Sequence, residues 1–361
     1  MRDLCVSGVS FLWGRRDLGF LTRGRVLAVY VIGSTLTSTI PGISIAGEMP
    51  LATLFTPALD AEYVYLGEPR SVDVIPVTPT GIPTPAIITR VSLEVSSTPY
   101  IFIDSGSYVE PRIPVIRLKS SVYGRRIDRE NALPAGSSEK IFEEAYSLGE
   151  RISRGLDALL IGESIPGGTT TAMAILRGLG FESSELVSSS MRNNPMDLKK
   201  KVVNEALKRL REYMSPFEIN DALGDPVHIA IAGLVMGSLR NTRIILAGGT
   251  QMLAVLALIK SIEKNFDQDK ILIATTRWII KDRGREIRDF IERYFSRVSV
   301  AYTELDFGDS PHEGLRAYEE GYVKEGVGAG GTALLALCRG VSLRELIERI
   351  YSEYERVMRS I

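Results

Sequence analysis

The sequence has few of the residues on which disulfide bonds and metal sites depend. Its 361 residues include two cysteines, Cys5 and Cys338, near opposite ends, and two histidines, His228 and His312. Because no CxxC pair and no Cys/His spacing typical of zinc occurs, we expect neither a disulfide nor a zinc site. So little cysteine favours a reducing compartment, and we expect the cytoplasm. We interpret both histidines as single structural or surface residues without partners.

The sequence also lacks an excess of charge and any long apolar run. Lys and Arg number 43 against 44 Asp and Glu, a net charge of −1, so no bulk field would recruit nucleic acid. Nowhere do roughly 18 apolar residues follow one another without a charge, so no transmembrane helix is expected. We therefore expect neither nucleic acid nor a membrane as a partner.

From Arg25 onward, six short runs are rich in residues that favour strands. They are VLAVYVIGS, YIFIDSGS, LDALLIGES, RIILAGGT, KILIATTR and RVSVAYTE. Between many of them apolar residues repeat with helical spacing, as in 198–213, 252–262 and 287–295. This alternation predicts an α/β fold with a mainly parallel sheet flanked by helices. Ligands bind such sheets at the carboxyl ends of the strands, so functional residues are expected in the turns there.

The most informative turn is GESIPGGTTT at 162–171, between an apolar run and a helix-forming stretch. Its glycines allow the backbone to approach a ligand, and the first N–H groups of the next helix have no partner within that helix. Such a turn is typical of an anion site, and we interpret it as a phosphate cradle. Glu163 lies inside it and has no structural role that the sequence reveals.

This turn resembles a P-loop only in part. Of the pattern GxxxxGK[ST], Gly162, Gly167 and Thr169 match, but Gly168 occupies the position of the lysine. The missing lysine speaks against a triphosphate site, and so against an NTPase or a kinase. The alternative to the phosphate cradle is an ordinary strand-to-helix turn that Thr169 or Thr170 caps.

A second glycine-rich turn, EGVGAGG at 325–331, leads into another helical run. A dinucleotide-binding fingerprint would require a strand before it, whereas the preceding residues are charged and helical in pattern. The turn therefore presents a carboxylate, Glu325, at the N-terminus of a helix. Glu325 is either a helix-capping acid or a catalytic base held by a tight backbone path.

Two further turns supply candidate ligand contacts. LAGGTQ at 246–251 follows a predicted strand, and its glycines suit a plain turn and a ligand contact equally well. SSSMRNNP at 188–195, with Lys199 beyond it, offers hydroxyls, amides and a cation near the start of a helix. The alternative for this segment is a solvated loop that ends in a helix cap.

Taken together and in this order, the motifs resemble the nicotinate-nucleotide:dimethylbenzimidazole phosphoribosyltransferase family. The resemblance is carried by GESIPGGTTT, SSSMRNNPMDLKKKVV, GDPVHIAIAGLVMGS, ILAGGTQ and KEGVGAGGTALLAL. The segments TIPGISIAGEMP, LFTPALDAEYV and VIPVTPTGIPTPAIITR are similar to its archaeal-type branch. The likeness implies a homodimer with a Rossmann-like sheet and a smaller helical domain. We expect the catalytic domain at 25–310 and the smaller, mainly helical part at 1–24 and 311–361.

The resemblance also implies roles for single residues. The family's catalytic glutamate in its GEGTGA turn matches Glu325, its other active-site glutamate matches Glu163, and its phosphate-side lysine matches Lys199. The implied substrate-binding residues lie in the same turns: Gly167, Gly168, Thr169, Thr170, Ser188, Ser189, Gly248, Gly249, Gly326 and Gly328. Two positions depart from the bacterial pattern, because Gly168 replaces an asparagine and Val327 replaces a residue with a hydroxyl.

The family's enzymes transfer phosphoribose from nicotinate mononucleotide to a benzimidazole nitrogen, which gives α-ribazole phosphate and nicotinate. Because the leaving pyridinium departs as a neutral ring, no metal is required to neutralise it, and we expect no metal and no cofactor. Glu163 would stabilise the positive charge on the ribose, and Glu325 would take the proton of the incoming base. The alternative is a non-catalytic protein that kept the phosphate cradle and binds a nucleotide or a cobamide precursor.

Overall fold

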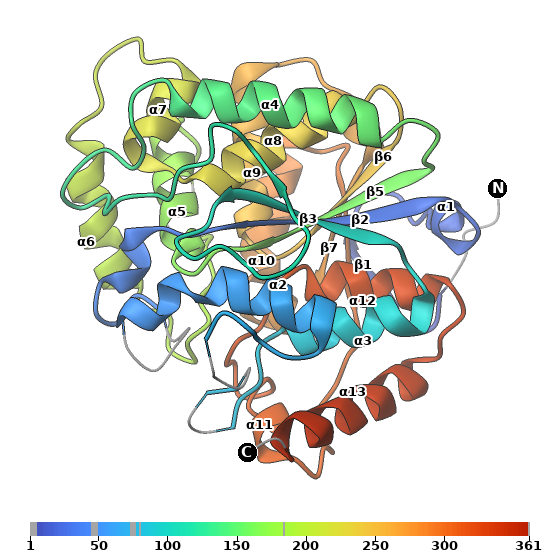
Figure 1. Ribbon diagram of the computed structural model, residues 1–361. Coiled ribbons are helices and arrows are strands. Elements are labelled where there is room, and N and C mark those ends of the chain that lie inside the picture. The colour runs from blue at the N-terminus through green and yellow to red at the C-terminus, as the bar shows by residue number, and fades with distance from the viewer. Residues whose placement is uncertain (1–5, 45–49, 73–76, 79–80, 183–184, 360–361) are drawn as a thin grey trace.

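The computed structural model describes residues 6–44, 50–72, 77–78, 81–182 and 185–359. Within these ranges eight strands form one sheet in the order β1-β8-β7-β6-β5-β2-β3-β4 (Figure 1). The strands are β1 (Val9–Trp13), β2 (Val26–Gly33), β3 (Tyr100–Gly106), β4 (Ile116–Arg117), β5 (Ala158–Ser164), β6 (Arg243–Ala247), β7 (Ile271–Thr276) and β8 (Ser299–Thr303). All neighbouring strands are parallel except β1 and β8. The predicted α/β fold is confirmed.

All six predicted runs form strands, whereas the two edge strands β1 and β4 were not predicted. β1 lies in the segment 1–24, which the sequence assigned to the smaller helical part. It pairs with β8, with Val9 opposite Thr303, so this part of the segment extends the sheet instead. The reason is local, because VSFLW is rich in the β-branched and aromatic residues that favour strands. The division of the chain into two domains stays a prediction.

Helices cover both faces of the sheet (Figure 1). One face carries α4 (Ser137–Ile152), α5 (Gly168–Gly178), α6 (Met196–Leu207), α7 (Pro216–Leu223), α8 (Pro226–Ser238), α9 (Gln251–Ile262) and α10 (Arg277–Tyr294). The other carries α1 (Gly19–Thr22), α2 (Thr56–Leu66), α3 (Ala86–Ser96), α11 (Glu313–Arg316), α12 (Ala329–Cys338) and α13 (Leu343–Met358). Short 3₁₀ helices are η1 (Leu36–Thr39), η2 (Pro50–Leu54) and η3 (Gln268–Lys270).

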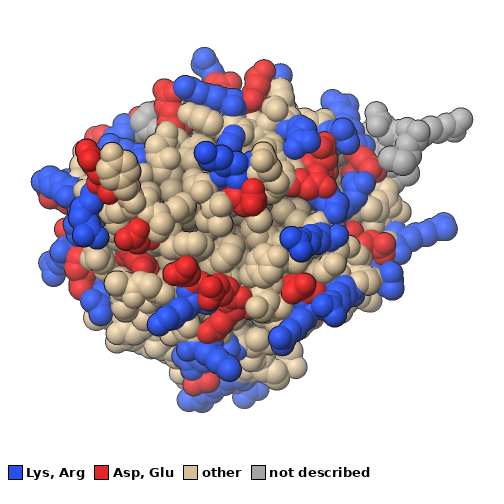
Figure 2. All heavy atoms as spheres, turned by 90° about the horizontal axis from the view of Figure 1, so that it is seen from above, with Lys and Arg blue, Asp and Glu red and all other residues tan. Residues whose placement is uncertain are grey.

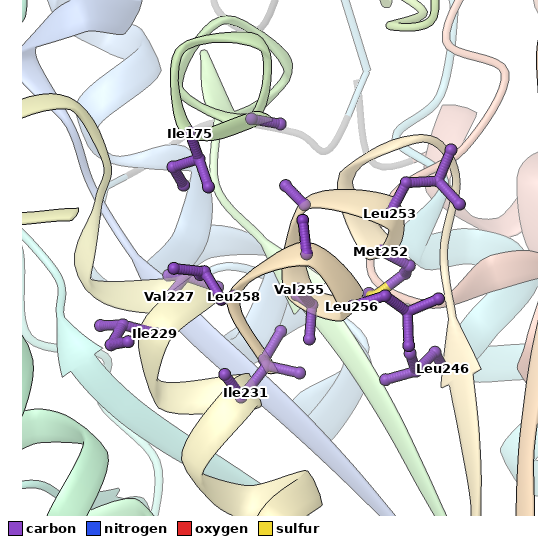
Figure 3. Packing of buried hydrophobic residues seen from close by; sticks show 14 of the residues in the cluster. Ile175, Val227, Ile229, Ile231, Leu246, Met252, Leu253, Val255, Leu256 and Leu258 are labelled. Carbon is purple, nitrogen blue, oxygen red and sulfur yellow. The ribbon is translucent and has the colours of Figure 1, made fainter. Parts of the chain in front are cut away.

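Two apolar cores lie on opposite faces of the sheet because successive strand residues point in opposite directions. In β5, Leu159 packs on the α8 and α9 side, whereas Leu160 packs on the α12 side. Figure 3 shows the first core, where α9 inserts Met252 and Leu256 between its neighbours. Each large apolar side chain buried in this way contributes about 1.5–3 kcal/mol of transfer free energy.

Helix α8 packs closely against α4 at two glycines. A Cβ atom at Gly233 would overlap the carbonyl oxygen of Phe142, and one at Gly237 would overlap that of Tyr146. Both helices are therefore close enough that only glycine fits at these two positions. This packing fixes the place of α8, whose N-terminal turn reaches the candidate site described below.

The surface has mixed charge on the face that α4 covers. Figure 2 shows Lys and Arg interspersed with Asp and Glu on this face. Among the described helices, none is both long and apolar enough to span a lipid bilayer. Of the two cysteines, Cys338 is buried at the end of α12, and Cys5 lies outside the described residues.

Candidate active site

Beyond the carboxyl ends of β5 and β6 lies a cavity of about 1070 Å³. Four segments build one wall: the turn before α5, the 188–190 loop, the turn before α9 and the loop before α12. Leu51 of η2, Leu59 of α2 and Phe55 between the two helices also line the cavity. Glu163 and Glu325 both line this cavity, so the fold brings the two predicted acids together.

Glu163 is the second-last residue of β5 and is only 2% exposed. Its Oε1 accepts a hydrogen bond from Nε2 of Gln251 at 2.9 Å, and its Oε2 accepts one from the backbone N–H of Ile165 at 3.1 Å. Burial and the nearby carboxylate of Glu325 raise the pKa of Glu163 well above its ordinary value. Glu163 therefore binds a proton more readily than an exposed glutamate unless positive charge reaches it.

Glu325 reaches from the loop before α12 to the carboxyl end of β7. Its Oε2 accepts hydrogen bonds from the Thr275 hydroxyl at 3.1 Å and from the Thr276 backbone N–H at 3.0 Å. Its Oε1 accepts from the N–H groups of Gly326 at 3.2 Å and Gly330 at 3.1 Å. Burial raises the pKa of Glu325 to about 7, although these donors favour the ionised form. Since Gly330 lies in the first turn of α12, Glu325 caps this helix and faces the cavity at the same time.

The loop that holds Glu325 has an unusual backbone. Val323, Lys324 and Val327 have φ angles of 60°, 34° and 51°, in the left-handed region that favours glycine. Such conformations cost about 1–3 kcal/mol each and persist only where the surroundings impose them. A Cβ atom at Gly330 would overlap the Thr275 carbonyl, so glycine is required where α12 meets β7.

The two glutamate turns touch each other through their backbones. The Val327 N–H donates to the Glu163 carbonyl oxygen at 2.8 Å. A Cβ atom built on Gly162 would lie 3.0 Å from the Cα atom of Gly328. A direct hydrogen bond and a pair of glycines therefore join the turns.

Gly168 makes room for Gln251. A Cβ atom at Gly168 would overlap the amide oxygen of Gln251, which extends from the first turn of α9 toward Glu163. Glycine in place of the asparagine of the bacterial pattern thus has a structural reason, because no side chain fits at position 168 while Gln251 binds Glu163.

Lys199 lies behind the cavity wall. This α6 residue is fully buried, and its Nζ donates to the Ser188 carbonyl oxygen at 2.6 Å and to the Thr169 hydroxyl at 2.9 Å. Burial and the repulsion of Lys324 and Arg283 lower its pKa to about 7. Lys199 does not line the cavity, and its two hydrogen bonds tie two segments of the wall together.

The other predicted site residues divide into two groups. Those that line the cavity are Gly167, Gly168, Thr169, Ser188, Ser189, Gly249 and Gly326, whereas Thr170, Gly248 and Gly328 lie behind it. The proposed threonine caps are not observed, because Gly167 precedes α5 at the capping position and no side chain caps this helix. The 188–195 segment likewise provides no side-chain cap for α6, which begins after Pro195.

The lining residues that were not predicted as site residues include Asp60, Gln251 and Lys324. Asp60 of α2 accepts hydrogen bonds from the hydroxyls of Thr84 and Ser164, both at 2.7 Å, and burial raises its pKa to about 6. Gln251 and Lys324 adjoin glycine-rich turns that the sequence did single out. Asp60 lies in an ordinary helical stretch, where no local pattern marks it.

The prediction that the histidines lack partners is wrong. His228 is fully buried, with Nε2 at 3.0 Å from the Gln251 amide oxygen and Nδ1 at 2.7 Å from Oδ2 of Asp225. His312 lies with its Nε2 at 3.3 Å from Oε1 of Glu355. Asp225 caps α8, which places its carboxylate beside a histidine three residues later. The pattern DPVH is a signal from which this pair was detectable.

Comparison with known proteins places these features in a family. A family model described as "Phosphoribosyltransferase" matches residues 95–276. A UPF0284 protein of Aeropyrum pernix is 50% identical over 338 residues, which are 93% of this chain and 94% of that protein. A UPF0284 protein of Saccharolobus islandicus is 45% identical over 332 residues, 92% of this chain and 93% of that protein. The chain belongs to this phosphoribosyltransferase family.

The fold of this family member is also found in solved structures. The nicotinate-nucleotide-dimethylbenzimidazole phosphoribosyltransferase of Thermus thermophilus superposes with a TM-score of 0.62, at 18% identity, and 92% of this chain and 90% of that chain are covered. A structure of CobT from the same organism superposes with a TM-score of 0.58, again at 18% identity, over 89% and 86% of the two chains. These likenesses show the shared fold.

The match to the phosphoribosyltransferase model spans the Glu163 turn, Lys199 and β7. Glu325 lies outside the matched residues, yet Thr275 and Thr276 at the end of the match hold its carboxylate. The arrangement presents two acids of raised pKa to one cavity, with cationic side chains beside and behind its wall. Such a site can bind an anionic group at one place and receive a proton at another.

Proposed function

We propose that the protein transfers the phosphoribosyl group of nicotinate mononucleotide to a ring nitrogen of a benzimidazole-type base. The observation that carries the proposal is the meeting of Glu163 and Glu325 in one cavity. The volume of about 1070 Å³ is at the upper end of ordinary ligand pockets, so a nucleotide and a base fit together.

In the proposed reaction the bond between C1′ of the ribose and the pyridinium nitrogen breaks. Its electron pair leaves with nicotinate, and positive charge develops on the ribose. The buried carboxylate of Glu163 stabilises that charge, because an ion pair is strong where water is excluded. Glu163 must be ionised for this role.

The incoming base is activated at Glu325. This carboxylate accepts the N–H proton of the base, and the other ring nitrogen then attacks C1′ to give α-ribazole phosphate. A general base works best when its pKa is near the working pH, which the pKa of about 7 for Glu325 satisfies. The four donors around its oxygens hold it in one orientation.

The 5′-phosphate is assigned to the wall formed by the α5 turn and the 188–190 loop. The N–H groups of Gly168 and Thr170 are bonded to the carbonyls of Ile165 and Gly167, so the helix start favours an anion mainly through its dipole and through Thr169 at the lining. Lys199 ties the two segments together. Lys324 adds a second cation at the cavity surface. The apolar side chains of Leu51, Phe55 and Leu59 in the cavity lining supply a surface for a flat base.

The test is to incubate the protein with nicotinate mononucleotide, with and without 5,6-dimethylbenzimidazole, and to separate the products by chromatography. We expect nicotinate and α-ribazole phosphate in equal amounts, and only when the base is present. Binding of nicotinate mononucleotide in a calorimeter without base-dependent release of nicotinate would contradict transfer and support the non-catalytic alternative.

A further inference from the structure

A buried chain of polar side chains leads from Glu163 away from the cavity. The Glu163 carboxylate accepts from Nε2 of Gln251 at 2.9 Å, and the Gln251 amide oxygen faces Nε2 of His228 at 3.0 Å. On the other side of the ring, Nδ1 of His228 lies 2.7 Å from Oδ2 of Asp225. Thr171 of α5 donates its hydroxyl to the same Asp225 oxygen at 2.5 Å. The chain thus joins the end of β5 to the N-termini of α9 and α8.

The direction of these contacts fixes where the protons are. An amide oxygen only accepts hydrogen bonds, so Nε2 of His228 carries the proton between it and Gln251. Oδ1 of Asp225 accepts from the N–H groups of Val227 and His228, both at 2.9 Å, as an ionised carboxylate does. Burial alone would raise the pKa of Asp225, but the His228 ring and the hydrogen bonds to the carboxylate lower it. With a carboxylate oxygen 2.7 Å from Nδ1 and an amide oxygen 3.0 Å from Nε2, both nitrogens of the His228 ring face oxygen atoms.

We infer that Asp225, His228 and Gln251 form a support chain that turns an amide N–H toward Glu163 and places a positive charge behind it. Because the Gln251 oxygen is engaged by the His228 cation, its NH₂ group must face Glu163. A carboxylate that faces an NH₂ group is favoured in its ionised form. The support chain therefore keeps Glu163 ionised and oriented, which makes His228 and Gln251 positioning residues.

The charges around Glu163 show why such support is needed. The titratable groups that act on it are Glu325, Asp225 and Asp60, all of which favour its protonated form. The His228 cation offsets the charge of Asp225 and polarises the amide between itself and Glu163. With a neutral His228 the amide would reverse, its oxygen would face Glu163, and Glu163 would hold the proton. The two arrangements contain the same number of protons, so the charge of His228 and that of Glu163 are linked.

The first experiment measures the histidine directly and needs no activity. The sequence has two histidines, so ¹⁵N-histidine labelling gives the ring signals of two residues, which the variant His312→Gln assigns. We expect both ring nitrogens of His228 to be protonated at pH 7 in the unliganded protein. A neutral His228 ring with one protonated nitrogen would overturn the inference, whether or not the protein proves to be a transferase.

The second experiment rests on the proposed function and uses His228→Gln, whose uncharged amide can still donate to Gln251. We expect the pKa that Glu163 contributes to the acidic limb of the kcat/KM profile to move up by about one pH unit, as loss of a nearby opposite charge does. At pH values below this limb, turnover should fall about tenfold, and it should recover at alkaline pH. KM for nicotinate mononucleotide should stay unchanged.

The matched control is Ser238→Ala, which removes a buried hydroxyl from the same helix at a distance from the chain. We expect its pH profile to equal that of the wild type. A His228→Gln variant whose activity drops equally at every pH would show a merely structural role and overturn the inference. Absence of transfer by the wild type would contradict the proposed function alone, and the ¹⁵N measurement would still decide the charge of His228.

Discussion

The two glycine-rich turns that carry Glu163 and Glu325 each hold a buried glutamate at the cavity, but with different hydrogen-bond donors. Glu325 is held by three backbone N–H groups and one hydroxyl, whereas Glu163 is held by one backbone N–H and the Gln251 side chain. Burial raises the pKa of both: to about 7 for Glu325, where four donors favour the ionised form, and well above its ordinary value for Glu163, where the Glu325 carboxylate adds to the effect of burial. Neighbouring carboxylates and the kind of donor therefore distinguish two acids of the same type.

The difference determines what each acid is suited to do. Glu325 gains and loses a proton near neutral pH, and its donors belong mostly to the backbone, so it can act as a base without moving. In the proposed transfer Glu163 must stay ionised, and the support chain of Asp225, His228 and Gln251 is inferred to favour that form. Substitutions at either acid, or at the residues that hold it, test this difference.

The largest effect is expected for Glu325→Gln. Because an amide cannot accept the proton of the base, kcat should fall about 10²- to 10⁴-fold. The affinity for nicotinate mononucleotide, measured by calorimetry, should change little. The control is Glu320→Gln, the same change at an exposed position, which should leave turnover intact. Unchanged turnover in Glu325→Gln would remove this residue from the mechanism.

The next largest effect is expected for Glu163→Gln. Loss of the charge that faces the ribose should lower kcat by about 10²- to 10³-fold, the range found when one electrostatic contact to a transition state is removed. Single-turnover release of nicotinate measures this step directly. Glu182→Gln, on the surface, is the matched control. If Glu163→Gln releases nicotinate at the wild-type rate, as the control Glu182→Gln is expected to do, a group other than Glu163 stabilises the positive charge on the ribose.

A smaller effect is expected for Gly168→Ala. The added methyl group would overlap the Gln251 amide, so the variant should lose about 1–3 kcal/mol of unfolding free energy. Displacement of Gln251 from Glu163 should also lower kcat about tenfold. Denaturant unfolding and steady-state kinetics measure the two effects. Gly19→Ala, where a Cβ atom would lie 3.5 Å from its nearest neighbour, should show neither.

The smallest effect is the pH dependence that Glu325 imposes. Its pKa of about 7 means that the ionised base becomes more abundant as pH rises, so kcat/KM should increase through about pH 7 and then level off.

The folded protein binds this proton more tightly than the unfolded chain. The corresponding stability is therefore present below the ordinary glutamate pKa and is lost as pH rises through about 7. Thermal unfolding at pH 5 and pH 8 should show this loss in the wild type and less of it in Glu325→Gln.

Much of the architecture was predictable from local patterns. The six β-rich runs are strong signals because buried parallel strands are almost continuously apolar, and all six form strands. Within 311–361, the part predicted as mainly helical, α13 spans Leu343–Met358. β1 was missed because five half-buried residues outside the alternating region carry a weak pattern.

The site was predictable only where chemistry coincides with a glycine turn. Glu163 and Glu325 stand out because glycines surround them, and both reach the same cavity. Asp60 contacts the site from a helix, where a single polar residue has no distinguishing neighbours. Gln251 and His228 have local signals, in LAGGTQ and DPVH, but these do not show that the two side chains meet behind Glu163. Their roles depend on contacts between segments far apart in the sequence, and spacing along one chain does not encode such contacts.

The backbone contact between the Glu163 and Glu325 turns has a consequence for how specificity can change. Gly162 lies against Gly328, and Val327 is bonded to the Glu163 carbonyl, so main-chain atoms set the gap between the acids. Exchanging side chains leaves that gap as it is. Homologues that accept a larger or smaller aromatic ring should therefore differ at other lining positions, such as Leu51, Phe55 and Leu59, while the acid pair stays where it is.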